Sequence, residues 1–199
     1  MLQFIETICF EHGAFQRIPL HQERMNRSRN HFFNSPDIIS LKELLDIPEL
    51  LRNLKVKCRI TYSDCIENIE YETYTPKETG KLKCVYDDHI NYAYKLKNRK
   101  AIELLLARRG EADDILIVKE GCVTDASYAN VLFLKENRWY TPEHPLLQGT
   151  RRAHYLQNGM ISAIQIKPAD LWQFEEVRLI NAMLSIEDAV SIPINRIIL

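Results

Sequence analysis

The sequence has little that would support a metal centre, a disulfide framework or a membrane anchor. Its five cysteines are an odd number and include no CxxC pair, which argues against zinc and disulfides. The six histidines are scattered without the spacing of metal ligands. No apolar stretch is long enough to cross a membrane, and the N-terminus does not read as a signal peptide. We therefore expect a cytoplasmic protein with free thiols and no metal.

The chain also lacks a strong charge of either sign. Its 26 basic and 27 acidic residues give a net charge of -1. Such a balance creates no global field that would attract nucleic acid or an anionic membrane. We expect neither as a partner. The 199 residues are enough to bury a substantial core in one large domain or two small ones.

The periodicity of the two halves differs, which predicts two domains. The first half reads as two strand hairpins and a helix over residues 21–33. The second half has many short strands and few helices, as in a closed, barrel-like sheet. We predict a smaller α+β domain over residues 1–80 and a larger barrel-like domain over residues 81–199.

Lys95 is the first candidate for chemistry, because it follows Tyr92 and Tyr94 and lies just before a predicted helix. Most single lysines are solvated surface residues, so this position alone decides nothing. Burial beside Tyr92 and Tyr94 would favour the neutral amine that covalent chemistry with an aldehyde requires.

Three further segments have a chemical interpretation beside an ordinary structural one. Asp125 is either an exposed turn carboxylate or a buried acid that pairs with a cationic ligand nitrogen. Gly149 precedes a helix that begins at Thr150, and a helix N-terminus of this kind binds phosphate. Arg24 is either a solvated helix charge or an inward-facing phosphate ligand.

Taken together, the segments resemble the class IV aminotransferases, the pyridoxal 5′-phosphate (PLP) enzymes of fold type IV. The likeness runs from Phe4-Ile5-Glu6-Thr7 to Asn181-Ala182. It implies an α+β fold with an N-terminal α/β sandwich and a C-terminal pseudo-barrel, as in D-amino-acid aminotransferase. It also implies a homodimer that acts on a small amino-acid-like substrate.

The resemblance assigns a role to each matching position. Lys95 in K-x-x-N-R would hold the cofactor as an imine and act as the catalytic residue, and Asp125 would pair with the pyridine nitrogen. The remaining cofactor-binding positions would contact the phosphate or the ring: Arg24, Leu147, Gly149, Thr150, Arg151, Asn181, Ala182 and Met183.

The chain departs from the family pattern at three points. Asp125 stands where the family usually has glutamate, and Arg151 stands where threonine is common. The chain also begins almost at the Phe4 strand, so we expect an N-terminally shortened member of the family. Substrate residues are therefore hard to assign: Arg17, Arg59, Arg99 and Arg152 are all candidates for a substrate carboxylate, and we predict Arg59 and Arg99.

The form of the lysine motif, Lys95 to Arg99, is similar to aminodeoxychorismate lyase. That resemblance implies cleavage of 4-amino-4-deoxychorismate to pyruvate and 4-aminobenzoate, a folate precursor. One alternative is a transaminase acting on a branched-chain or D-amino acid. A second is a PLP-binding relic that has lost catalysis.

Overall fold

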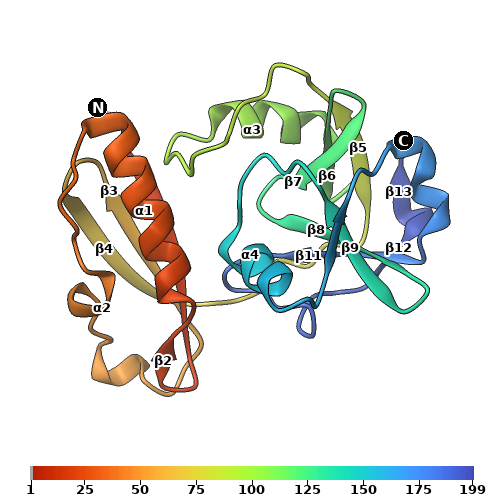
Figure 1. Ribbon diagram of the computed structural model, residues 1–199. Coiled ribbons are helices and arrows are strands. Elements are labelled where there is room, and N and C mark those ends of the chain that lie inside the picture. The colour runs from red at the N-terminus through yellow and green to blue at the C-terminus, as the bar shows by residue number, and fades with distance from the viewer. Residues whose placement is uncertain (1) are drawn as a thin grey trace. The chain divides into compact units, whose positions relative to one another are not determined.

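The computed structural model describes residues 2–199, which form two compact units (Figure 1). Of the described residues, 2–75 and 94–98 form the first unit, and 76–93 and 99–199 form the second. Each unit has its own apolar core, and each is described separately below. The expected α+β class is confirmed, because helices and mixed sheets occur together in the chain.

The first unit is built on an antiparallel sheet with the strand order β2-β1-β3-β4. Its strands are β1 (Phe4–Glu11), β2 (Ala14–Phe15), β3 (Val56–Tyr62) and β4 (Ile66–Thr73). In the pairing of β1 with β3, Phe4 lies opposite Tyr62 and Thr7 lies opposite Arg59. Because successive side chains of a strand point to opposite faces, this register separates an apolar face from a more polar one.

The apolar face of this sheet is covered by helix α1 (Ile18–Phe33), as Figure 1 shows. Pro19 lies in the first turn, where its missing N–H leaves no hydrogen bond unmade. Asn34 ends the helix in a left-handed conformation, with φ at 51°, that asparagine tolerates. Two short helices, α2 (Leu41–Leu44) and the 3-10 helix η1 (Glu49–Leu51), follow before β3.

The second unit is a mixed sheet with the order β10-β9-β8-β7-β6-β5-β13, in which β11 pairs with β8 and with β12. Its strands are β5 (Leu82–Tyr86), β6 (Asp114–Lys119), β7 (Cys122–Ala126), β8 (Asn130–Lys135), β9 (Arg138–Pro142), β10 (Ser162–Ile164), β11 (Glu176–Ile180), β12 (Ile192–Pro193) and β13 (Ile197–Ile198). The helices are α3 (Lys100–Leu106), η2 (Ala107–Arg109), α4 (Thr150–Gln157), η3 (Pro168–Gln173) and η4 (Ile194–Arg196).

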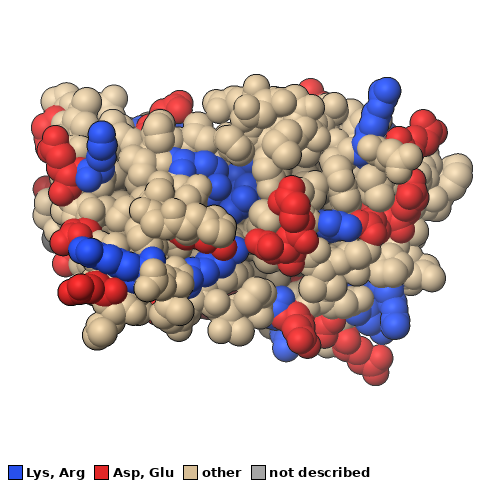
Figure 2. Space-filling view, turned by 90° about the horizontal axis from the view of Figure 1, so that it is seen from below, with Lys and Arg blue, Asp and Glu red and all other residues tan. Residues whose placement is uncertain are grey.

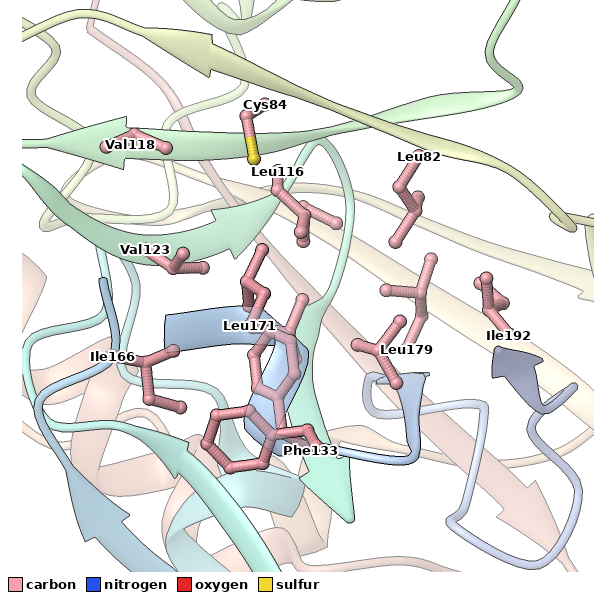
Figure 3. Packing of buried hydrophobic residues seen from close by; sticks show 14 of the residues in the cluster. Leu82, Cys84, Leu116, Val118, Val123, Phe133, Ile166, Leu171, Leu179 and Ile192 are labelled. Atoms are coloured by element: carbon pink, nitrogen blue, oxygen red, sulfur yellow. The ribbon is translucent and has the colours of Figure 1, made fainter. Parts of the chain in front are cut away.

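One apolar cluster fills the interior of the second unit. In Figure 3, side chains from β5, β6, β7, β8 and η3 point toward one another, with Phe133 and Leu171 near the centre. Leu82, Leu116 and Phe133 are fully buried. Full burial of such side chains contributes about 1.5–3 kcal/mol each, so this cluster provides a rigid support for the loops at the strand ends.

The charged side chains of the surface are of mixed sign. Figure 2 shows lysine and arginine interspersed with aspartate and glutamate over one face, as expected from the near-zero net charge. Over residues 2–199, no helix is both long and apolar enough to cross a membrane. The same residues contain no group of three or more His, Cys, Asp or Glu side chains that could hold a metal ion.

Candidate active site

The sequence-predicted site residues fall into two groups, one in each unit. The first unit holds Arg24, Arg59 and Lys95. The second unit holds the other predicted positions, which are Arg99, Asp125, Leu147, Gly149, Thr150, Arg151, Asn181, Ala182 and Met183.

Lys95 belongs to a short segment that pairs with the beginning of β1. The Ile5 N–H donates to the Lys95 carbonyl at 2.9 Å, and Phe4 forms an antiparallel bridge with Leu96. The side chains of Tyr94 and Leu96 pack against the cluster beneath α1, where Tyr94 stacks on His31. The Leu96 N–H donates to the Tyr94 carbonyl at 2.8 Å, which closes a tight turn around Lys95. With both of its neighbours packed against the cluster, the Lys95 side chain is directed away from it.

Arg59 lies on the same face of the first unit as Lys95. Its neighbours in β3, Cys58 and Ile60, are buried in the cluster beneath α1, so Arg59 points to the other face. There it lies opposite Glu70 of β4. Lys95 and Arg59 therefore share a face, although Arg59 has an acidic neighbour that would compete with a substrate carboxylate.

Arg24 projects inward from α1 and forms a buried network with Glu6 of β1. Its Nε donates to Glu6 Oε1 at 2.8 Å, and its Nη2 donates to Glu6 Oε2 at 2.6 Å. His21 Nδ1 lies 2.6 Å from the same Oε2 atom. Arg24 is thus not a solvated helix charge: its guanidinium is held in a fixed orientation by a bidentate pair.

The ionisation of this network follows from burial and from the arginine. Burial by itself would raise the pKa of Glu6, but the Arg24 guanidinium and the His21 hydrogen bond lower it to about 2. Burial lowers the pKa of His21, against the opposing effect of Glu6. At neutral pH we therefore assign a carboxylate to Glu6 and a neutral imidazole to His21, whose Nδ1–H donates to it.

Replacing Glu6 by glutamine is expected to lower the free energy of unfolding at pH 7 by about 3–5 kcal/mol, because Arg24 would remain as a buried charge without its counter-ion. Urea denaturation of the cofactor-free protein measures this. Since the pKa of Glu6 is depressed from 4.5 to about 2, its stabilisation is present above pH 4.5 and lost as the pH falls through 2.

The matched control for that substitution is Glu72→Gln. Glu72 pairs with Lys57 on the sheet surface, where its side chain is 60% exposed. An exposed pair contributes at most about 1 kcal/mol. Equal, small losses for Glu6→Gln and Glu72→Gln would contradict a buried network at Arg24.

Asp125 forms the centre of the second group. One carboxylate oxygen accepts from Asn130 Nδ2 at 2.6 Å, and the other accepts from the Leu147 N–H at 3.0 Å. Asn130 Nδ2 also donates to the Leu147 carbonyl at 2.9 Å. Asp125 and Asn130 are paired residues of β7 and β8, so the sheet register itself brings the two side chains together.

Burial raises the pKa of Asp125 to about 7, although the Leu147 and Asn130 hydrogen bonds and the Arg152 charge lower it in part. The side chain is only 5% exposed, so Asp125 is not an exposed turn carboxylate. A cation placed beside it would stabilise the ionised form. The site is therefore suited to a ligand that presents a protonated nitrogen.

Gly149 brings the start of α4 against the Asp125 network. A Cβ at this position would lie 1.9 Å from Asn130 Oδ1, so only glycine permits this approach. The helix begins at Thr150 without a side-chain cap, and Thr150, Arg151 and Arg152 are all buried. The Asn181–Met183 segment follows β11, whose last residue, Ile180, pairs with Asn130.

The two arginines near Asp125 have structural contacts. Arg99 Nη2 donates to the Ser127 carbonyl in the turn after β7. Its Nε is buried with no hydrogen-bond partner among the described atoms. Arg152 donates to Pro142 O at 2.7 Å and to Thr141 Oγ1 at 3.2 Å, which ties α4 to β9. Through its bond to the Ser127 carbonyl, Arg99 helps to position the turn beside Asp125.

The structure places four further residues in these networks: Glu6, His21 and Asn130, for which the sequence predicted no role of their own, and Arg152, which it offered only as a candidate for a substrate carboxylate. A signal for three of them was present in the sequence. Glu6 lies in the F-x-E-T pattern, His21 precedes Arg24 by three residues, and Asn130 ends the V-T-x-x-x-x-x-N pattern. Arg152 had no local signal, because its effect on Asp125 depends on tertiary contact.

A cavity of about 500 Å³ lies beside β7 in the second unit. Its lining includes Tyr92, Cys122, Thr124, His144 and Leu146. Thr124 and Leu146 each precede a residue of the Asp125 network. None of the sequence-predicted site residues lines this cavity.

The chain matches known proteins over nearly its whole length. The model of the amino-transferase class IV family matches residues 3–192. A Haemophilus influenzae protein of uncharacterized function is 39% identical over 185 residues, which are 92% of this chain and 98% of that protein. A Haemophilus somnus structure, provisionally described as a 4-amino-4-deoxychorismate lyase, is 36% identical. The match covers 92% of this chain and 97% of that one, with a TM-score of 0.86.

A more distant structure shows the fold alone. It comes from Mesorhizobium loti, is provisionally described as an amino-acid aminotransferase, and is 18% identical with a TM-score of 0.74. The alignment covers 97% of this chain and 98% of that one.

The residues of the second unit fit the cofactor of this family. PLP presents a pyridine nitrogen, and the buried Asp125 is a carboxylate that a protonated ring nitrogen would stabilise. PLP also presents a phosphate, and α4 begins at Gly149 without a side-chain cap, as a phosphate-binding helix start does. With the family model matching most of its length, the chain belongs to the class IV aminotransferases, which are PLP-dependent enzymes of fold type IV.

Proposed function

We propose that this protein is a 4-amino-4-deoxychorismate lyase, which releases pyruvate and 4-aminobenzoate. The observation that carries this choice is the 36% identity to the Haemophilus somnus structure over 92% of the chain. The K-x-x-N-R motif at Lys95 supports the same choice.

We also propose that the protein is a cytoplasmic homodimer, as the family resemblance implies. Light scattering after size-exclusion chromatography measures the mass of the holoenzyme, and a monomer mass would contradict the homodimer.

The binding residues divide according to the chemical groups of PLP. Arg24, the N–H groups at Thr150 and Arg151, and the Asn181–Met183 segment bind the phosphate. Leu147 packs against the ring. Asp125 keeps a proton on the ring nitrogen, for which its burial and its two hydrogen bonds to Asn130 and Leu147 prepare it.

Lys95 holds the cofactor covalently and then serves as the proton carrier. When bound, PLP withdraws electrons from the substrate carbon that bears the amine. The free Lys95 amine would take the proton from that ring carbon, and the electron pair left behind would form a ring double bond. The C–O bond to the side chain would break with its electrons on oxygen, releasing enolpyruvate, which takes up a proton to become pyruvate. Aromatisation of the product drives the reaction, so the main task of the chain is to orient the amine.

The test is a product assay on the purified holoenzyme. Incubation with 4-amino-4-deoxychorismate should give 4-aminobenzoate, detected by its fluorescence, and an equal amount of pyruvate, detected with lactate dehydrogenase. The same protein is incubated separately with a panel of branched-chain and D-amino acids plus 2-oxoglutarate. Heat-inactivated enzyme and Lys95→Ala serve as controls.

Each outcome of the assay identifies one function. Formation of 4-aminobenzoate and pyruvate supports the lyase. Glutamate formation from 2-oxoglutarate without 4-aminobenzoate would replace it with a transaminase. A coloured protein that turns over none of these substrates would indicate a PLP-binding relic.

A further inference from the structure

Arg151 is a buried arginine in the first turn of α4, at the position where the family often has threonine. Its Nε donates to the Asn181 carbonyl at 2.8 Å, and its Nη2 donates to the Ala182 carbonyl at 3.1 Å. The side chain is only 8% exposed. One planar guanidinium therefore connects the start of α4 to two successive carbonyls of the segment that follows β11.

The segment that Arg151 holds is itself an ordered turn. Asn181 Oδ1 accepts from the N–H groups of Met183, at 2.8 Å, and Leu184, at 3.0 Å. The Asn181 N–H donates to the Leu184 carbonyl at 3.1 Å. The N–H groups of Asn181, Met183 and Leu184 are thus used within the turn, while the Asn181 and Ala182 carbonyls connect the turn to α4 through Arg151.

The guanidinium has a third neighbour that limits its own motion. Arg151 Nη1 lies 3.5 Å from Tyr155 Oη, one helical turn further along α4, and the guanidinium carbon lies 6.0 Å from the centre of the Tyr155 ring. Tyr155 Oη in turn accepts from the Ile186 N–H at 3.1 Å. The arginine is thus held from its own helix while it binds the turn.

We propose that Arg151 is a positioning residue that clamps the Asn181–Leu184 turn to the start of α4, so that the helix start keeps a fixed position for the cofactor phosphate. The proposal rests on the proposed phosphate-binding role of these two segments. Arg151 acts through the backbone it holds, because its Nε and Nη2 are used by the two carbonyls.

The experiment compares the dissociation constants of PLP and of pyridoxal, which lacks the phosphate, by absorbance titration of the cofactor-free protein. The ratio of the pyridoxal dissociation constant to the PLP dissociation constant measures the contribution of the phosphate to binding. Arg151→Lys keeps the positive charge but loses the planar fork, whereas Arg151→Met loses both. We expect both variants to lower the ratio by about tenfold, since each loses hydrogen bonds from a charged donor.

Gln157→Ala is the matched control, because it shortens an exposed side chain at the far end of the same helix and leaves both carbonyl contacts of Arg151 in place. Its ratio should stay within about twofold of wild type. Asn181→Ala loosens the same turn from the other side and should lower the ratio, which keeps the proposal testable if Arg151→Met does not fold. Faster amide hydrogen exchange at residues 181–184 in Arg151→Lys, measured without cofactor, is a second expected result.

The outcomes separate the clamp from the function on which it rests. A wild-type ratio in Arg151→Lys would assign the effect to charge and overturn the clamp. Unchanged ratios in Arg151→Lys, Arg151→Met and Asn181→Ala would also overturn the clamp. A wild-type protein that binds PLP no better than pyridoxal would overturn the proposed phosphate site, and the clamp with it.

Discussion

Lys95→Ala is expected to abolish covalent cofactor binding and to lower turnover by about ten-thousandfold or more, because it removes both the covalent attachment and the proton carrier. The absorbance band of the enzyme-bound cofactor should be lost. Reduction of the wild-type holoenzyme with borohydride should add the mass of the reduced cofactor to the peptide that contains residue 95. The same treatment should leave the Lys95→Ala protein unmodified.

Lys97→Ala is the matched control for this substitution. Lys97 lies two residues further along the same segment, is exposed, and contacts Gln3 only through its backbone N–H, at 2.9 Å. Its removal should leave the absorbance band and the turnover within about twofold of wild type. Borohydride labelling at another lysine of the wild-type protein, or a coloured and active Lys95→Ala protein, would refute the assignment of Lys95.

Asp125→Asn is expected to lower turnover by about a thousandfold, because a neutral amide cannot keep the proton on the ring nitrogen of the cofactor. Cofactor binding should survive, since the phosphate contacts are unchanged. The measurement is a single-turnover assay of the loaded variant, together with its absorbance spectrum as a function of pH.

The same substitution makes a prediction about the pH dependence of stability. Burial raises the pKa of Asp125 from 3.8 to about 7 in the folded, cofactor-free protein. The folded state therefore binds the proton more tightly than the unfolded state. The contribution of Asp125 is fully favourable below pH 3.8 and is lost as the pH rises through 7.

We expect the free energy of unfolding of cofactor-free wild type to fall, relative to that of Asp125→Asn, by a few kcal/mol between pH 4 and pH 8. The amide of the Asp125→Asn variant has one acceptor oxygen fewer for the Asn130 and Leu147 donors, so the two proteins differ in stability at every pH. The informative quantity is therefore how the difference between their free energies of unfolding changes with pH. PLP should reduce this pH dependence, since a protonated ring nitrogen stabilises the carboxylate. Asp170→Asn, in the partly exposed helix η3, removes the same charge and should show no such dependence. A wild-type profile parallel to that of Asp125→Asn would refute the buried carboxylate.

The local sequence pattern was sufficient for the fold class and for the chemical type of the candidate residues. Gly149 before a helix, an acid in the apolar strand at Asp125, and a lysine before α3 are all local features of the chain. Local propensity and periodicity depend on near neighbours, so the sequence indicates the elements on which these residues lie. The order of such motifs along the chain then identified the family, which the match over residues 3–192 confirmed.

The contacts that give these residues their properties were decided only by the tertiary structure. Residues 94–98 pack with the first unit through the pairing of Ile5 with Lys95, which a division of the chain at residue 80 does not anticipate. The sequence predicted Arg24 as either a helix charge or a phosphate ligand, and only the packing of α1 on β1 places Glu6 Oε2 2.6 Å from Arg24 Nη2. The raised pKa of Asp125 and the hydrogen bonds of the Arg151 guanidinium likewise depend on burial and on partners up to 31 residues away. Burial and long-range pairing are properties of the whole packed chain, and for that reason they are not encoded in any one motif.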